Sequence, residues 1–202
     1  MSQSEAAQPG WRRNFTILWL SQLVAMLGFS TAIPFLPLYV QRLGVTEPAA
    51  AAAWAGAMSS FGALTMAFMA PVWGALADRY GRKPMVTRSM IVGGGIVALM
   101  AAANDVRQLL LLRSIQGAFS GTVAASRVLA AGIVPASRLG QSLGMMATAA
   151  FVGNAVGPAV GATLAAQLGL RYSFVFTAIA LTVAGIWIAL AVRAPEPRGA
   201  TT

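Results

Sequence analysis

The feature that most constrains the fold of this chain is a series of long apolar runs separated by short charged clusters. No charged residue occurs from Pro48 through Ala77, a run longer than the ~20 residues that a helix needs to cross a bilayer. Charged residues make up 9% of the chain and hydrophobic residues 57%, whereas soluble domains carry about 25% charged residues. No stretch has the polar and apolar alternation of a transmembrane β-barrel. The pattern therefore predicts an all-α membrane protein.

Six apolar segments predict six spanning helices in one transmembrane domain, residues 14–192, between two polar tails at 1–13 and 193–202. The predicted spans cover residues 14–40, 49–75, 84–103, 108–134, 139–167 and 171–192. Arg12 and Arg13 precede the first span, as they would in a signal peptide. The apolar part is far longer than the 7–15 residues of a signal sequence, so we interpret it as an uncleaved spanning helix.

An even number of spans places both termini on one side of the membrane, and the basic residues indicate which side. Ten of the fourteen lie on the side of the termini: Arg12, Arg13, Arg79, Arg82, Lys83, Arg88, Arg127, Arg138, Arg193 and Arg198. Arg42, Arg107 and Arg171 lie on the other side, and Arg113 lies within the membrane. The positive-inside rule therefore predicts cytoplasmic termini in a cell inner (plasma) membrane. The same placement explains the net charge of +9 without nucleic-acid binding.

Two residue types are missing from the sequence. There is no Cys, which excludes disulfides and thiol chemistry, and no His, the commonest metal ligand and general base. The sequence therefore predicts no metal site, no cofactor and no enzymatic activity. Partners would be the lipid bilayer and a small-molecule substrate, with protons as a possible coupling ion.

The stretch G-A-L-A-D-R-Y-G-R-K joins the second and third predicted spans. Its two glycines favour a tight turn at the membrane surface. Positive-inside bias explains its basic residues, but it gives no reason for an acid at this place. We therefore interpret the stretch as a candidate gating loop. Its candidate site residues are Gly74, Asp78, Arg79, Gly81, Arg82 and Lys83. Arg88 follows one turn inside the next span and is expected to extend back to the surface.

The fourth span carries an intramembrane charge. Arg113 lies about six residues, or ~9 Å, from the outer surface. A charge within a span costs about 2.5–3.5 kcal/mol even on the gentlest insertion scale. Gln116 and Gly117 follow at spacings of three and four, so all three share one face. Arg113 could extend to the outer headgroups, but Gly117 and Gly121 form a GxxxG pair nearby. That pair favours a face that packs closely or lines a cavity.

The fifth span is rich in glycine, and the first is bent by proline. Gly144, Gly153, Gly157 and Gly161 accompany Pro158, which should free the carbonyl of Asn154 and kink the helix. This spacing would serve ordinary helix packing alone, or it would let the helix pivot and open or seal a path. In the first span, the corresponding set is Gly28, Pro34 and Pro37, whose prolines should bend its outer half.

These four patterns together resemble motifs of the major facilitator superfamily. The stretch Gly74–Lys83 is similar to its motif G-x-L-a-D-r-x-G-r-k between helices 2 and 3. The residues from Leu109 to Gly117 resemble its helix 4 motif, and Gly144–Gly161 resembles its helix 5 antiporter motif. The residues Leu27–Pro37 resemble the helix 1 motif of twelve-span drug:proton antiporters. The chain thus resembles the N-terminal six-helix half of such a carrier, built from two inverted three-helix repeats.

The resemblance implies an exporter that works by alternating access around a cavity between helices 1, 2, 4 and 5. Asp78 and Arg82 would form an inner latch, Arg113 would touch substrate or couple to protonation, and helix 5 would limit leak. The sequence departs from the family in two places. Gly132 occupies a position near the inner end of helix 4 where many relatives carry an acid. No Asp or Glu lies within any predicted span.

The chain has six predicted spans where the family has twelve. A homodimer would reproduce the two parallel halves of the family. Alternatively, the second half is encoded separately or the chain is the N-terminal fragment of a longer carrier. Two other functions remain open from the sequence: transport of a specific metabolite, and a non-transporting membrane scaffold. An Arg113→Ala variant with unchanged activity would favour the scaffold.

Overall fold

The computed structural model describes residues 10–192, apart from the side chain of Thr122; the rest of the two predicted tails lies outside this range. Every described element is a helix. The elements are α1 (Trp11–Ala32), η2 (Ile33–Phe35), α2 (Leu36–Arg42), α3 (Pro48–Tyr80), α4 (Arg82–Ala101), α5 (Val106–Phe119), α6 (Thr122–Ile133), η3 (Ala136–Arg138), α7 (Leu139–Gln167) and α8 (Leu170–Ala191).

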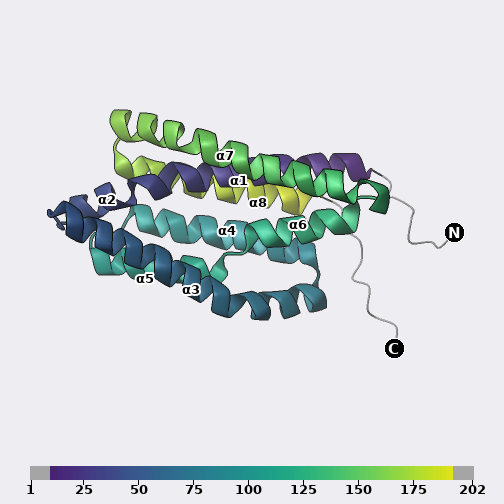
Figure 1. The fold of residues 1–202 in the computed structure, drawn as a ribbon, viewed down its shortest axis with the longest axis horizontal. Coiled ribbons are helices and arrows are strands. Elements are labelled where there is room, and N and C mark those ends of the chain that lie inside the picture. Colours follow the sequence, from purple (N-terminus) through teal and green to yellow (C-terminus); the bar gives the residue numbers. More distant parts are fainter. Residues whose placement is uncertain (1–9, 193–202) are drawn as a thin grey trace.

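The helices form one elongated bundle. In Figure 1, α1, α8 and α4 lie in its middle, α7 lies on one side and α3 with α5 on the other. The start of α1 and the end of α8 lie at the same end of the bundle as the α3–α4 turn. Five helical stretches are long and apolar enough to cross a membrane, and α5 with α6 makes up the remaining predicted span. The architecture confirms the predicted all-α class.

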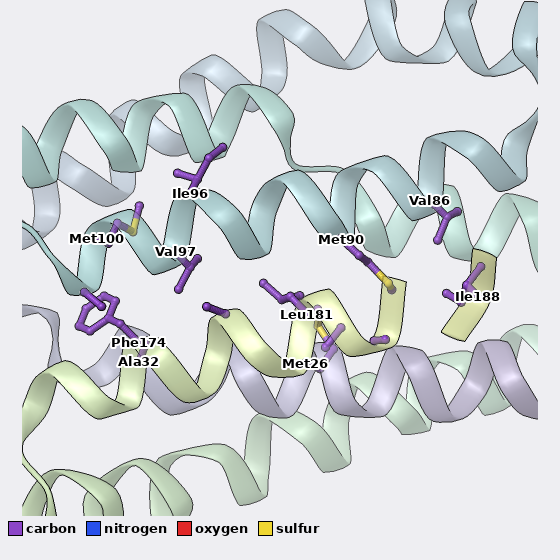
Figure 2. Packing of buried hydrophobic residues seen from close by; sticks show 14 of the residues in the cluster. Met26, Ala32, Val86, Met90, Ile96, Val97, Met100, Phe174, Leu181 and Ile188 are labelled. Atoms are coloured by element: carbon purple, nitrogen blue, oxygen red, sulfur yellow. The ribbon is translucent and has the colours of Figure 1, made fainter. Parts of the chain in front are cut away.

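The interior of the bundle lies between α4 and α8, with α1 against them (Figure 2). Met90, Val97 and Leu181 are each at most 2% exposed and meet across the α4–α8 boundary. Close approach of these two helices depends on glycine: a methyl group added at Gly185 would lie 2.8 Å from Ile91. Small residues at such contacts are typical of membrane helices, where packing rather than hydrophobic burial drives association.

The first predicted span bends where its prolines predict. α1 ends at Ala32, a 3₁₀ turn carries Pro34, and α2 begins at Leu36. Each proline lacks the N–H that would continue the α-helical hydrogen bonds. The predicted bend in the outer half of this span is therefore confirmed.

The second predicted span is longer than predicted, and its connection to the third is shorter. α3 continues through Gly74 and Asp78 to Tyr80, so the expected turn with two glycines is wrong. The turn consists of Gly81 alone, at φ 93°, ψ 153°, with its N–H donating to the carbonyl of Ala77 at 3.0 Å. A glycine inside a helix costs about 1 kcal/mol but does not end it. Gly81 ends it because its positive φ is readily adopted only by glycine.

The fourth predicted span, residues 108–134, is broken, which the sequence prediction missed. α5 ends at Phe119 and α6 begins at Thr122, with Gly121 between them at φ 126°. This backbone conformation again requires glycine. α5 packs against α3 and α4, whereas α6 beyond the break packs against α4, α1 and α7. Figure 1 shows the chain crossing from one side of the bundle to its middle at this point.

Candidate functional site

The polar pair predicted on the fourth span lies inside the bundle. On α5, the Arg113 guanidinium nitrogen Nη1 donates a hydrogen bond to Oε1 of Gln116. Gln116 is 2% exposed. Both side chains line a cavity of about 20 Å³ whose other walls include Phe29 and Phe174. Such a space is about large enough for one water molecule. The Arg113–Gln116 pair therefore places a cation and an amide in an apolar interior rather than in the headgroups.

The contact between α3 and α5 fixes where Arg113 sits. A methyl group at Gly117 would overlap the carbonyl oxygen of Gly62 on α3, and the Thr65 hydroxyl donates to the carbonyl of Ser114 at 2.8 Å. The predicted close packing at Gly117 is confirmed. The predicted GxxxG pair is wrong at Gly121, because that residue forms the helix break and has no atom within 4 Å of an added methyl group.

The candidate gating residues lie at the Gly81 end of the bundle. Asp78 and Arg82 line one cavity of about 300 Å³ between α3, α4 and the α5–α6 break. Arg82 Nη1 donates to the carbonyl of Val128 on α6 at 3.2 Å. Within the described part of the chain, no ion pair or hydrogen bond joins the Asp78 carboxylate to another residue. The two residues of the predicted latch thus share a cavity without forming a salt bridge.

The remaining residues of this stretch lie around the same turn. Arg79 stacks on the Tyr80 ring at 5.5 Å, and Lys83 follows Arg82 in the first turn of α4. Gly74 lies inside α3 with open space beside it. A methyl group at Gly132 would lie 3.4 Å from Arg82 Nη1. Gly132, one of the two places where the sequence departs from the family pattern, therefore faces Arg82.

Arg88 does not extend to the surface as expected. Its guanidinium carbon lies 3.3 Å from the centroid of the Trp73 ring and 5.6 Å from that of Phe119. Trp73 is itself held by a 2.6 Å hydrogen bond from its indole N–H to the carbonyl of Ala118. The charge is kept inside the bundle because a cation over an indole face is stabilised electrostatically. Hydropathy alone carries no signal for this contact between two helices.

The glycine ridge of the fifth span packs against α1. Methyl groups at Gly153 and Gly157 would lie 2.7 Å and 2.8 Å from backbone atoms of Leu27, and one at Gly161 would overlap the carbonyl oxygen of Thr31. The predicted close packing along these three glycines is confirmed. Gly144, by contrast, has open space around it.

The other members of the helix 1 and helix 5 motifs lie outside this glycine ridge. The carbonyl of Asn154, which Pro158 leaves without a helical partner, accepts a hydrogen bond of 2.9 Å from the Ser30 hydroxyl. The carbonyl of Gly28 accepts one from the hydroxyl of Thr177 on α8. Pro34 lies in the 3₁₀ turn and Pro37 in the first turn of α2.

Two residues that the sequence did not single out close the opposite end of the bundle. The Tyr39 hydroxyl is buried and donates to the carbonyl of Met100 at 3.0 Å, with the carbonyl of Ala101 at 3.2 Å. Arg171 Nη2 lies 3.3 Å from both the carbonyl of Ala103 and Oδ1 of Asn104. Together they hold the α4–α5 connection. Among the described residues, no group of three or more His, Cys, Asp or Glu side chains could hold a metal ion.

Comparison with known proteins agrees with this geometry. The chain is 42% identical over 173 residues to the multidrug resistance protein MdtG of Citrobacter koseri, covering 86% of this chain and 43% of that protein. It is 38% identical over 194 residues to MdtG of Escherichia fergusonii, covering 96% of this chain and 48% of that protein. The chain therefore spans about half the length of these relatives.

A solved structure and a family match complete the comparison. The fold is similar to that of the human organic anion transporter MFSD10 (TETRAN), with a TM-score of 0.74 at 23% identity. The match covers 93% of this chain and 49% of that one, so the fold is half of that architecture. Residues 18–202 match the family Major Facilitator Superfamily. On this match and on the identity to MdtG, the chain belongs to the major facilitator superfamily of membrane transporters.

Proposed function

We propose that this chain is one six-helix half of a carrier that exports small hydrophobic or amphipathic compounds by alternating access, in exchange for protons. The observation that carries the proposal is the Arg113–Gln116 pair, held inside an apolar bundle. A charge at this depth is costly and is seldom retained without a role in a path for ions or substrates. The relatives named multidrug resistance protein support the substrate class.

Arg113 is proposed to touch substrate or to couple transport to protonation. Within the described helices, Asp78 is the only acidic residue, and it lies two residues before the end of α3 at Tyr80. Proton coupling in this proposal therefore uses Asp78 or an acid supplied by a second six-helix unit. The inner latch would likewise combine Asp78 and Arg82 with a residue of that unit. The tight contact of α7 with α1 would limit the leak of ions through the carrier.

The second unit is proposed to cover the outer faces of α3 and α7. Small residues are exposed on both helices: Gly56, Ser60, Ala63 and Ala67 on α3, and Thr148, Ala155, Ala159, Ala162 and Ala166 on α7. Both helices also expose large side chains, such as Phe68 and Phe151 at 78% and 73% exposure. On α8 the exposed apolar residues are all large, with Leu190 and Ile179 at 82% and 58% exposure. Small residues are typical of helix–helix contacts in membranes, so α3 and α7 suit a partner and α8 suits lipid.

The partner would be a second copy of this chain or a separately encoded half. Both termini would lie in the cytoplasm, and the carrier in the cell inner membrane, because the Gly81 end of the bundle carries most of the basic residues. Transport by a single copy of this chain, with no second unit, would contradict this assembly.

The test is transport by the purified chain in liposomes under an imposed pH gradient, with the number of copies counted. We expect dye extrusion that Arg113→Ala abolishes and that Arg107→Ala, an exposed arginine six residues earlier, preserves. Unchanged extrusion in Arg113→Ala would favour a scaffold that does not itself transport. Extrusion that persists after the gradient is collapsed would exclude antiport. A single metabolite accepted in place of several dyes would favour a specific transporter.

A further inference from the structure

The cavity at the Gly81 end has features that the gating residues do not explain. It measures about 300 Å³ and lies between α3, α4 and the α5–α6 break. Sites for small molecules begin at about this volume. Its walls are mainly apolar and include Met66, Met85 and Val128. Met66 is 43% exposed, so the cavity lies beside the outer surface of α3.

One wall of the cavity carries the guanidinium of Arg88, and some of its N–H groups have no hydrogen-bond acceptor among the described residues. Arg88 lines the cavity, and its Nε and Nη1 atoms are buried without a hydrogen-bond partner among the described residues. Buried polar atoms are nearly always paired, and each exception calls for an explanation. The stack on Trp73 does not supply a partner, because the N–H groups of a guanidinium point outward in its own plane. Two donors of Arg88 therefore lack an acceptor among the described residues, and the protein leaves this guanidinium only partly satisfied.

The charges around the cavity favour an anion. Arg82 and Arg88 stand against the one carboxylate of Asp78, and Arg82 is already bonded to the carbonyl of Val128. The lining thus has one positive charge in excess. Guanidinium groups bind phosphate with paired hydrogen bonds, which a lysine cannot reproduce.

The depth and the apolar walls favour an anion that carries a hydrocarbon chain. Arg88 lies six residues after Arg82, the first residue of α4, or about 9 Å along the helix. This is the depth at which headgroups give way to acyl chains when α4 crosses a bilayer. A soluble anion would lose its water there, whereas a lipid phosphate already lies close to that level.

We propose that this cavity binds the phosphate of an anionic phospholipid, with Arg88 as its ligand and the first methylene groups of a chain against Met66 and Met85. A helix of a partner subunit cannot enter a space of this size. The cavity also touches Ser120 and Gly121, so a bound lipid would contact the break between α5 and α6. The site would make the bundle sensitive to the headgroup composition of its membrane.

The test is native mass spectrometry of the purified full chain in detergent, with phosphatidylglycerol or phosphatidylethanolamine added at equal concentration. Both lipids carry a phosphate, but only phosphatidylglycerol keeps a net negative charge to balance the excess positive charge of the lining. We therefore expect one phosphatidylglycerol retained with at least about tenfold preference, which corresponds to about 1.4 kcal/mol. Arg88→Gln should remove that preference. Arg138→Gln, which removes a charge from an exposed residue at the same end of the bundle, should keep it.

A second variant tests the cavity without changing any charge. Ala70→Leu fills a wall of the cavity and should also reduce the retained phosphatidylglycerol, so the result does not depend on the folding of Arg88→Gln. Dodecyl phosphate should displace the lipid, and inorganic phosphate at equal concentration should not.

Three results would overturn the proposal. The first is equal retention of both lipids by the unmodified chain. The second is full retention of phosphatidylglycerol by both single variants, Ala70→Leu and Arg88→Gln. The third is displacement by inorganic phosphate as effective as that by dodecyl phosphate, which would assign the cavity to a soluble anion instead.

Discussion

The hydroxyl oxygen of Ser30 on α1 donates a hydrogen bond of 2.9 Å to the carbonyl oxygen of Asn154 on α7. This carbonyl has no partner within its own helix, because Pro158, four residues later, has no N–H. The proline therefore does more than remove one hydrogen bond from α7. It supplies an acceptor that a neighbouring helix uses, on the same side of α7 as the glycine ridge.

Replacing Ser30 with Ala should weaken this contact. The expected loss in the free energy of unfolding is about 0.6 kcal/mol and at most ~1.7 kcal/mol, the range found for hydrogen bonds between membrane helices. Unfolding in mixed micelles with increasing dodecyl sulfate measures it. Thr148→Ala is the matched control, because the Thr148 hydroxyl bonds only to its own helix, at the carbonyl of Met145. Equal losses in both variants would contradict the assignment.

Gly117 should not tolerate even one methyl group. Gly117→Ala would overlap the carbonyl oxygen of Gly62 and separate α5 from α3, at a cost of about 1–3 kcal/mol for overpacking. The same unfolding measurement applies. Gly56→Ala on α3, with open space around it, should be neutral or slightly stabilising. The prediction fails if the two alanines behave alike.

The break between α5 and α6 depends on the backbone of Gly121. At φ 126°, any other residue is strained, and Gly121→Ala should lower stability by about 1–3 kcal/mol. Gly140→Ala, in the first turn of α7 with no neighbouring atom within 4 Å, is the comparison and should gain up to about 1 kcal/mol. A stable Gly121→Ala variant would mean that the two helices can join into one.

Tyr39 should control the order of the α4–α5 connection. Tyr39→Phe removes the hydroxyl that bonds the carbonyl of Met100, at an expected cost of about 1 kcal/mol. Hydrogen exchange of the amides in residues 102–105 should become faster. Tyr172→Phe, half-exposed near the start of α8, should leave that exchange unchanged. Unchanged exchange in Tyr39→Phe would show that Arg171 alone holds the connection.

Most spans of this fold could be predicted from the sequence, because each span is a long segment over which hydropathy and charge can be averaged. The run from Pro48 to Ala77 could only be a span, and the spacing of Arg113 and Gln116 placed both on one face. The bounds were harder to predict. Gly74 and Gly121 look alike in the sequence, yet one is helical and the other breaks a helix. The difference lies in which neighbouring helices each half of a span meets.

Contacts between helices were the least predictable part of the site. Trp73 and Arg88 meet across the α3–α4 turn, and only the rotation of each helix about its axis decides that. The latch of Asp78 and Arg82 stays a prediction, since its third member would come from a second unit. The glycine ridge of α7 was predictable as a packing surface, but its neighbour, α1, follows only from the folded bundle.

The connection between α3 and α4 has a mechanical consequence. With Gly81 as the only residue between two long helices, the turn has no slack, and two dihedral angles set the angle between α3 and α4. A change in the tilt of α3 against a partner must then also change the orientation of α4. One residue inserted after Gly81 would let α3 move while α4 stays still, so the length of this connection, as much as its charges, sets what the inner end of the bundle can do.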